Sequence, residues 1–367
     1  MNYKRVLAMT GKEFIQIIRD WRSLGLALLI PVFMLILFGY ALTLDVDNVP
    51  LAVWDQDKSV ASRDFIRLFS GSPYFKVAGY VQRYGQIEDA IDNNSVFAGL
   101  VIPRDFSALL SSGRASPVQL ILDGSNSNTA SITLGYAQGI VLGYNLGLSR
   151  RLPPVDLRPR VWFNPDLRSR NYIVPGLIAI IMMVVGGLLT GLTVSREWER
   201  GTMEQLISTP VHRSEIILGK LIPYFCLGIT DVLIAVLMGI FLFGVPLRGS
   251  IPLLFCFCAL FLAGVLGQGI LISIVTRNQF LSTQLVFMST FLPAFLLSGF
   301  AFPIANMPAP VQAVTYLVPA RYLITVLRGI YLKGVGLAVL WPEAVFLALF
   351  AALMLVAADR KFIKKVA

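Results

Sequence analysis

Long apolar runs dominate the pattern of hydrophobic and polar positions along the chain. A membrane-spanning helix needs about 20 mostly apolar residues, and several runs reach this length with one charged residue or none. Prolines crowd the second half of the longest run, 278–320, so only its first part predicts a span. The pattern predicts six transmembrane helices, at about 23–44, 173–194, 221–247, 249–276, 280–301 and 338–358.

A long polar stretch, 45–171, separates the first predicted span from the five spans within 172–358. Runs of strand-forming residues alternate there with helical patterns, which predicts a small α/β domain. The expected fold is an α-helical membrane protein with six transmembrane helices and an inserted α/β domain. The predicted strands are 49–54, 75–81, 97–102 and 118–122, and the predicted helices are 59–69, 86–92, 103–110 and 127–148.

The beginning of the chain, a late proline-rich segment and the end of the chain also lie outside the predicted spans. In 1–22, apolar residues recur at helical spacing between basic ones, which predicts an amphipathic helix at the membrane interface. The proline-rich segment 302–337 predicts an outer re-entrant segment, with Pro319, Arg321 and Arg328 as candidate residues of an outer gate. The last residues, 359–367, predict a short polar tail.

Composition agrees with a membrane protein and excludes several other classes. Apolar residues make up 56% of the chain and charged residues only 14%, too apolar for a soluble globule or a disordered chain. The three cysteines lie in apolar runs and there is one histidine, which excludes a disulfide framework and a histidine-rich metal site. No metal is expected.

The net charge of +10 would suggest nucleic acid in a soluble protein, but here the basic residues flank the spans and no nucleic-acid partner is expected. Segments 1–22, 195–220, 276–280 and 359–367 together hold 14 Lys and Arg, against 4 in 245–251 and 302–337. Basic residues are enriched on the cytoplasmic side. The distribution therefore predicts that both termini are cytoplasmic and that the domain at 45–171 is extracytoplasmic.

Residues 195–210 place five charges within nine residues between two predicted spans. Gly201 is expected to end one helix, and Thr202 with Gln205 predicts a capping box that starts another. Thr209-Pro210 predicts a further helix start. A short charged helix at the membrane surface suits docking of a cytoplasmic partner, whereas a solvated loop that contacts lipid remains an equal alternative.

Three polar side chains lie inside predicted spans, where they are costly unless they face protein or water. Asp231, Gln268 and Gln284 are therefore candidates for a transport pathway. The alternative for Asp231 is a protonated carboxyl group bonded to a neighbouring hydroxyl or amide.

Several motifs follow one another along the chain: Lys12-Glu13, Arg19-Asp20, residues 122–128, the run Glu197-Trp198-Glu199-Arg200-Gly201-Thr202-Met203-Glu204-Gln205-Leu206 with Pro210 and Gly219-Lys220, and then 306–308 and 318–322. In this order they resemble ABC-2 type transporter permeases, above all the bacterial multidrug-type subgroup with a large extracytoplasmic domain. The likeness covers nearly the whole chain. Trp198 departs from it, because many relatives carry a polar or charged residue there.

The resemblance implies a permease subunit of an exporter in the bacterial inner membrane, not an enzyme. A second permease chain, as a homodimer or a heterodimer, and a separate ABC ATPase subunit would be its partners, with lipid and a periplasmic adaptor as further ones. ATP and Mg²⁺ would be held by the ATPase, since this chain has no G-x-x-x-x-G-K-[ST] loop and is expected to bind no cofactor. By position, the coupling residues would be Glu197, Glu199, Arg200, Gly201, Thr202 and Glu204.

A second class of function fits the same pattern. A membrane-anchored receptor or an envelope assembly factor would use the inserted α/β domain to bind a ligand. The charged segment between two spans favours the permease, and an ATPase that copurifies with the chain would distinguish the two.

Overall fold

The computed structural model describes residues 2–41, 48–124, 127–148 and 168–362. The chain divides into a helical unit (Met1–Thr43 and Val161–Ala367) and an α/β unit (Leu44–Arg160). Parts of four predicted segments lie outside the described residues: the end of the first span, the end of the polar insert, the C-terminal tail, and residues 125 and 126 of the motif at 122–128.

Five helices of the described chain are long and apolar enough to cross a membrane, or six if a bent pair counts as one span. The protein is thus mostly helical, as predicted. The helical unit contains α1 (Tyr3–Arg19), α2 (Trp21–Ala41), α7 (Ser169–Gly191), α8 (Thr193–Glu199), α9 (Thr202–Ser208), α10 (Arg213–Phe241), α11 (Ile251–Thr276), α12 (Gln279–Leu297), α13 (Ala309–Thr315), α14 (Pro319–Arg328) and α15 (Leu337–Lys361), with a 3-10 turn at Ile304–Asn306 and a π-helical turn at Gly329–Lys333.

Helix ends differ from the predicted spans where local backbone geometry intervenes. The apolar part of α2, Ala27–Tyr40, is shorter than the five spanning helices, although a span was predicted at 23–44. The predicted span at 280–301 ends early as α12, because Gly299 adopts a left-handed φ of 81°. The span predicted at 221–247 begins earlier, at Arg213, and ends at Phe241.

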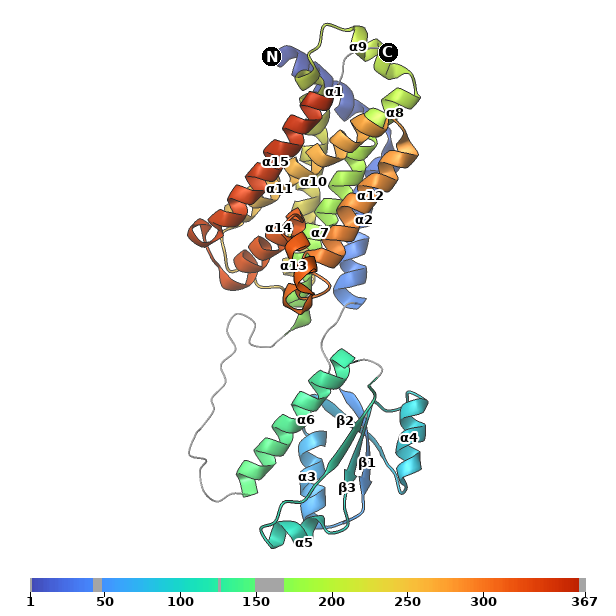
Figure 1. Cartoon of the computed structure of the whole chain (residues 1–367), viewed down its shortest axis with the longest axis vertical. Coiled ribbons are helices and arrows are strands. Elements are labelled where there is room, and N and C mark those ends of the chain that lie inside the picture. Colours follow the sequence, from blue (N-terminus) through green and yellow to red (C-terminus); the bar gives the residue numbers. More distant parts are fainter. Residues whose placement is uncertain (1, 42–47, 125–126, 149–167, 363–367) are drawn as a thin grey trace. The chain divides into compact units, whose positions relative to one another are not determined.

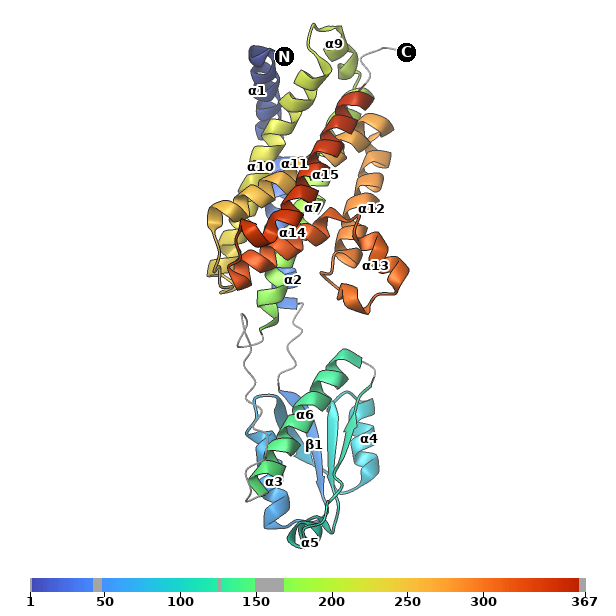
Figure 2. The same ribbon diagram turned by 60° about the vertical axis from the view of Figure 1, so that its left-hand side comes forward.

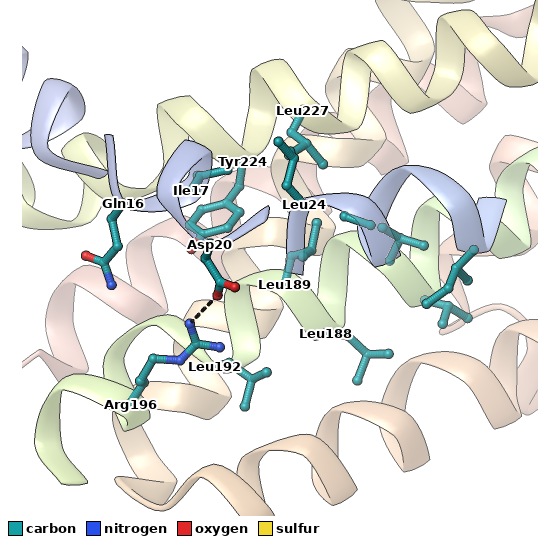
Figure 3. Close-up of a pocket in the computed structure, with 14 residues that line it drawn as sticks. Gln16, Ile17, Asp20, Leu24, Leu188, Leu189, Leu192, Arg196, Tyr224 and Leu227 are labelled. Carbon is teal, nitrogen blue, oxygen red and sulfur yellow. Dashed lines mark ion pairs between the residues drawn. The ribbon is translucent and has the colours of Figure 1, made fainter. Parts of the chain in front are cut away.

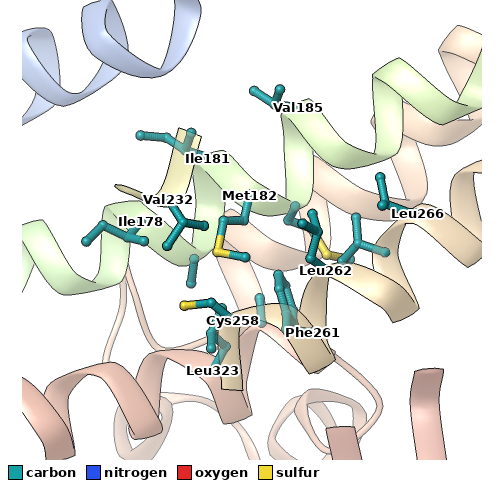
Figure 4. Packing of buried hydrophobic residues seen from close by; sticks show 14 of the residues in the cluster. Ile178, Ile181, Met182, Val185, Val232, Cys258, Phe261, Leu262, Leu266 and Leu323 are labelled. Carbon is teal, nitrogen blue, oxygen red and sulfur yellow. The ribbon is translucent and has the colours of Figure 1, made fainter. Parts of the chain in front are cut away.

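Helix α7 forms the centre of the helical unit. It is apolar on all sides and buried along most of its length, as expected for a helix surrounded by others. Figure 4 shows Ile178 and Met182 of α7 among side chains of α10, α11 and α14, including Val232, Phe261 and Leu323. Packing against α7 thus positions α2, α10, α11, α12 and α14.

The backbones of α7 and α11 approach each other closely at Gly269. A Cβ atom there would lie 2.2 Å from Oγ1 of Thr190 and 2.6 Å from the carbonyl oxygen of Gly187. Because a real side chain cannot occupy that space, the contact requires glycine.

Two ends of the helical unit can be told apart in Figures 1 and 2. α1, α9 and the C-terminal end of α15 lie at one end, and α13 lies toward the other. Helix α13 and the segment Pro319–Lys333 are bent by 81° relative to each other, which fits both a broken span and the re-entrant segment predicted at 302–337.

The α/β unit contains a four-stranded sheet in the order β2-β1-β3-β4. β1 (Val49–Asp55) pairs in parallel with β2 (Phe75–Tyr80) and β3 (Ala98–Ile102), and β4 (Gln119–Leu122) pairs antiparallel with β3. The helices are α3 (Val60–Ser70), α4 (Tyr84–Asp92), α5 (Phe106–Ser111) and α6 (Ser127–Leu148). These elements lie where the sequence predicts them, except that α5 starts at Phe106 instead of 103.

Alternate residues of the central strands face the two sides of the sheet. Val49, Leu51 and Val53 of β1 join a core with Phe65 and Phe69 of α3. Helices α3 and α6 cover this face, whereas α4 covers the other (Figures 1 and 2). Both faces of the sheet are therefore covered within this unit.

We expect Gly269→Ala to destabilise the helical unit by about 1–3 kcal/mol, since even a methyl group overpacks the contact with α7. The measurement is thermal unfolding of the purified protein in detergent. Gly25→Ala is the matched control, because nothing lies within 4 Å of a Cβ atom at that helical glycine. Equal unfolding temperatures for the two variants would contradict the close contact.

Candidate functional site

The charged segment predicted to dock a partner forms a corner between two short helices. Gly201, with φ of 70°, ends α8 and turns the chain into α9. Helix α9 buries Met203 and Leu206 and exposes Glu204 and Gln205. Its polar face is therefore directed away from the rest of the unit.

Two expectations about this segment are wrong. Thr202 and Gln205 form no capping box, because Gly201 is the N-cap of α9 and the Thr202 hydroxyl donates instead to the Glu197 carbonyl (3.3 Å). No helix starts at Thr209-Pro210 either. α10 begins only after His212, whose backbone N–H donates to the Glu215 carboxylate (2.9 Å) in a capping box.

A cluster of buried charges joins α8 to α1 and α10. The Lys220 ammonium lies 2.9 Å from the Glu13 carboxylate and 3.0 Å from that of Glu197, which also accepts a hydrogen bond from Lys12 (3.1 Å). Lys220, Glu13 and Glu197 are only 1%, 2% and 5% exposed. Each carboxylate is therefore neutralised inside the chain, and Glu197 is not presented at the surface.

Helix α1 packs along the first turns of α10. Val6 and Met9 are buried there, and a Cβ atom at Gly219 would lie 2.5 Å from that of Met9. The backbone N–H of Asn2 donates to the Glu215 carboxylate (2.5 Å). The predicted amphipathic helix thus buries one face against protein, while its exposed apolar residues, Tyr3, Leu7, Ile15 and Ile18, remain available to a membrane surface.

Glu199 connects the end of α8 to the start of α12. Its carboxylate accepts hydrogen bonds from the backbone N–H of Gln279 (2.7 Å) and from the Gln279 side-chain amide. The guanidinium of Arg277 lies over the ring of Trp198, 4.5 Å from its centroid. Trp198, the residue at which the chain differs from many relatives, therefore has a partner within the chain.

Glu199, Arg200 and Glu204 are all exposed, but only Glu199 bonds to another helix. Within the described part of the chain, neither Arg200 nor Glu204 forms an ion pair. Of the six predicted coupling residues, only Glu197 is buried. Arg200 and Glu204 are the exposed charges that no ion pair among the described residues holds, so a partner could reach them without breaking the corner.

The three polar residues of the spans do not form one cluster. Asp231 on α10 is 4% exposed, and among the described residues neither of its carboxylate oxygens has a hydrogen-bond partner, so the expected hydroxyl or amide partner is not found. Gln268 on α11 donates to the Ser289 hydroxyl of α12 (3.4 Å). Gln284 is exposed on α12.

The predicted gate residues hold the bent segment against the helical core. Pro319 is buried at the start of α14, and the Arg321 guanidinium donates to the Thr315 hydroxyl of α13. The Arg328 guanidinium lies 3.4 Å from the ring centroid of Tyr172 and donates to the Gly299 carbonyl (3.3 Å). Arg328 thereby connects α14 to α7 and to the turn after α12.

Comparison with known proteins assigns the chain to a family. The model described as "ABC-2 family transporter protein" matches residues 21–358. The chain belongs to this family. It is a multi-pass permease subunit of an ABC transporter, and permeases of this family work with an ABC ATPase.

Three bacterial relatives of the permease align along nearly their whole length. It is 40% identical to the probable multidrug ABC transporter permease YbhS of Escherichia coli over 95% of this chain and 93% of the relative. It is 32% identical to the probable multidrug permease YbhR of the same organism, over 92% and 93%. The linearmycin resistance permease protein LnrN of Bacillus subtilis is 22% identical over 90% of this chain and 92% of the relative.

Sequence reasoning did not identify the ionic cluster of the permease. Lys12-Glu13 and Gly219-Lys220 were noted only as motifs, although Lys220 borders an apolar run, where a charge needs a partner. That signal could have indicated a buried pair. The partner of Lys220 could not be identified from the sequence, because Glu13 lies 207 positions away.

Lys220→Met should destabilise the permease by about 3–5 kcal/mol, because it leaves two buried carboxylates with only the half-exposed Lys12 as a neighbouring cation. Arg213→Met is the matched control on the same helix: Arg213 is half exposed in its pair with Asp359, and an exposed pair contributes about 0–1 kcal/mol. Thermal unfolding in detergent measures both changes. Similar losses in the two variants would show that the buried cluster does not hold α1, α8 and α10 together.

Proposed function

We propose that the permease exports a substrate from the cytoplasm, driven by ATP that a separate ABC ATPase subunit hydrolyses after docking on α9. The observation that carries this proposal is the exposed polar face of α9, which presents Glu204 beside Arg200. The neighbouring helix α8 has its own charges bonded within the chain. A partner with complementary charges can reach this face without breaking the corner.

The contacts of α8 support transmission of movement from α9 to the spans. Ser273 of α11 accepts hydrogen bonds from the backbone N–H groups of Val194 (3.1 Å) and Ser195 (2.9 Å) at the break between α7 and α8. With Glu197 bonded to Lys220 and Glu199 to Gln279, a displacement of α8 acts on α1, α10, α11 and α12 together.

We place the permease in a bacterial inner membrane with both termini in the cytoplasm and the α/β unit outside. The excess of Lys and Arg in the predicted cytoplasmic segments supports this orientation. So does the position of α1, α9 and the end of α15 at the same end of the helical unit (Figures 1 and 2).

The other partners follow from the same proposal. The permease would pair with a second permease chain, identical or related, and a periplasmic adaptor would contact the α/β unit. ATP and Mg²⁺ would remain on the ATPase, and this chain would bind no cofactor. Drug-like or lipid-like molecules are the proposed substrates, since relatives carry the words multidrug and linearmycin resistance in their names.

The proposed pathway uses the polar residues of the spans. Asp231, Gln268 and Gln284 would contribute polar groups to it, because a buried carboxylate is retained in a span only for a reason such as transport. Pro319, Arg321 and Arg328 would hold the outer gate closed through their contacts with α13, α7 and Gly299. The family assignment favours this function over a receptor or an assembly factor.

Glu204→Ala is expected to weaken binding of the ATPase subunit and to abolish transport while leaving the permease folded. If Glu204 is desolvated against a basic partner, its loss costs about 2–5 kcal/mol, whereas an exposed charge contributes about 0–1 kcal/mol. Glu204→Lys should be worse, because it repels the same basic groups. Affinity of the ATPase for the solubilised permease is measured at fixed salt.

Ser208→Ala is the control for Glu204, since Ser208 is also exposed on α9 but carries no charge. Glu199→Ala should lower ATPase affinity less than Glu204→Ala. If Glu204→Ala leaves both ATPase affinity and transport unchanged, the segment does not dock a partner. The main support for this function would then be lost.

Cysteine labelling tests the orientation. Asp92→Cys in α4 should react with an impermeant thiol reagent in cells with a permeabilised outer membrane, and Ser208→Cys in α9 should react only after lysis. The wild-type chain, with its three native cysteines, gives the background. The opposite pattern would invert the topology.

A further inference from the structure

A pocket of about 200 Å³ lies between α1, α2, α7, α8 and α10 (Figure 3). One end is polar, with Asp20 at the junction of α1 and α2, Arg196 on α8, and Gln16 and Tyr224 beside them. The remaining wall is apolar. A charged end joined to an apolar wall suits an amphipathic molecule.

The two charges at the polar end form a loose ion pair. The Arg196 guanidinium lies 3.7 Å from the Asp20 carboxylate, and the two side chains are 25% and 38% exposed. A partly exposed pair at this distance contributes little to stability. A ligand that brings both a cation and an anion can therefore replace it at little expense.

The apolar wall continues from this end along two helices. Leu24, Ala27 and Ile30 of α2 lie on one side, and Leu188 of α7 lies on the other. From Leu24 to Ile30 the helix rises about 9 Å. This wall gives a hydrocarbon chain a continuous surface to pack against.

We propose that this pocket binds one zwitterionic membrane phospholipid, with its ammonium on Asp20, its phosphate on Arg196 and one acyl chain between Leu24 and Leu188. Arginine suits phosphate because its planar guanidinium donates two parallel hydrogen bonds. An anionic headgroup would place a negative charge beside the Asp20 carboxylate. A cationic headgroup would place a positive charge beside the Arg196 guanidinium. Opposite charges side by side therefore select a headgroup that carries both.

This site is separate from the ATPase-docking face, and its existence does not depend on the proposed export function. With the proposed topology, the lipid would come from the inner leaflet. Its headgroup would bridge the α1–α2 junction and α8, so that binding stabilises the folded permease by mass action.

Native mass spectrometry of the full-length permease in detergent tests the headgroup preference. The probes are phosphatidylethanolamine and phosphatidylglycerol with identical acyl chains. We expect the wild type to bind one phosphatidylethanolamine about tenfold more tightly than phosphatidylglycerol, for a difference of one charged contact. Asp20→Asn should reverse the preference, because Arg196 then faces an anion without competition. Arg196→Gln should weaken phosphatidylethanolamine about tenfold or more.

A second pair of variants tests the acyl-chain wall without touching a charge. Leu188→Trp should fill the pocket and remove the bound lipid. Leu233→Trp is the matched control, since Leu233 is 45% exposed on α10 and does not line the pocket. Thermal unfolding without added lipid confirms that each variant is folded.

Equal affinity of the wild type for the two phospholipids would by itself overturn the proposal. So would a Leu188→Trp variant that binds lipid as well as Leu233→Trp does. If Glu204→Ala loses ATPase binding but still binds lipid as the wild type does, the lipid site and the docking face are independent, which supports both proposals. Unchanged ATPase binding in that variant would count against the proposed function alone.

Discussion

The Lys220 ammonium, buried between the carboxylates of Glu13 and Glu197, determines how one end of the helical unit is built. An ammonium removed from water is stable only when oppositely charged groups lie within bonding distance, and here both lie within 3.0 Å. Those groups come from α1 and α8, whereas Lys220 belongs to α10. The need to neutralise one charge therefore fixes three helices relative to one another.

This constraint gives α8 its position, and α8 in turn positions α9. The left-handed turn at Gly201 directs α9 outward, so the charges on the two sides of the corner serve different purposes. Glu197 and Glu199 are bonded to other helices, and Arg200 and Glu204 are exposed. A segment that looks uniformly charged in sequence thus contains charges bonded to other helices and charges with no ion-pair partner among the described residues.

Polar groups elsewhere in the unit are held in two contrasting ways. Arg328 bonds to the Gly299 carbonyl and covers the Tyr172 ring, which compensates for part of its desolvation. The Asp231 carboxylate, by contrast, has no hydrogen-bond partner among the described residues. A buried group that is retained without compensation is more readily explained by function than by stability.

The sequence by itself determined five of the six predicted spans, the elements of the α/β unit, the family resemblance and the lack of a phosphate-binding loop, because apolar runs, strand alternation and motifs are local properties of the chain. It could not determine that Glu197 is buried, that Thr202 bonds back to Glu197, or that Asp20 meets Arg196 beside an apolar wall. Those facts depend on which residues meet in space. Lys12 and Glu197 are 185 positions apart, and only the packing of α1 and α8 against α10 brings them together.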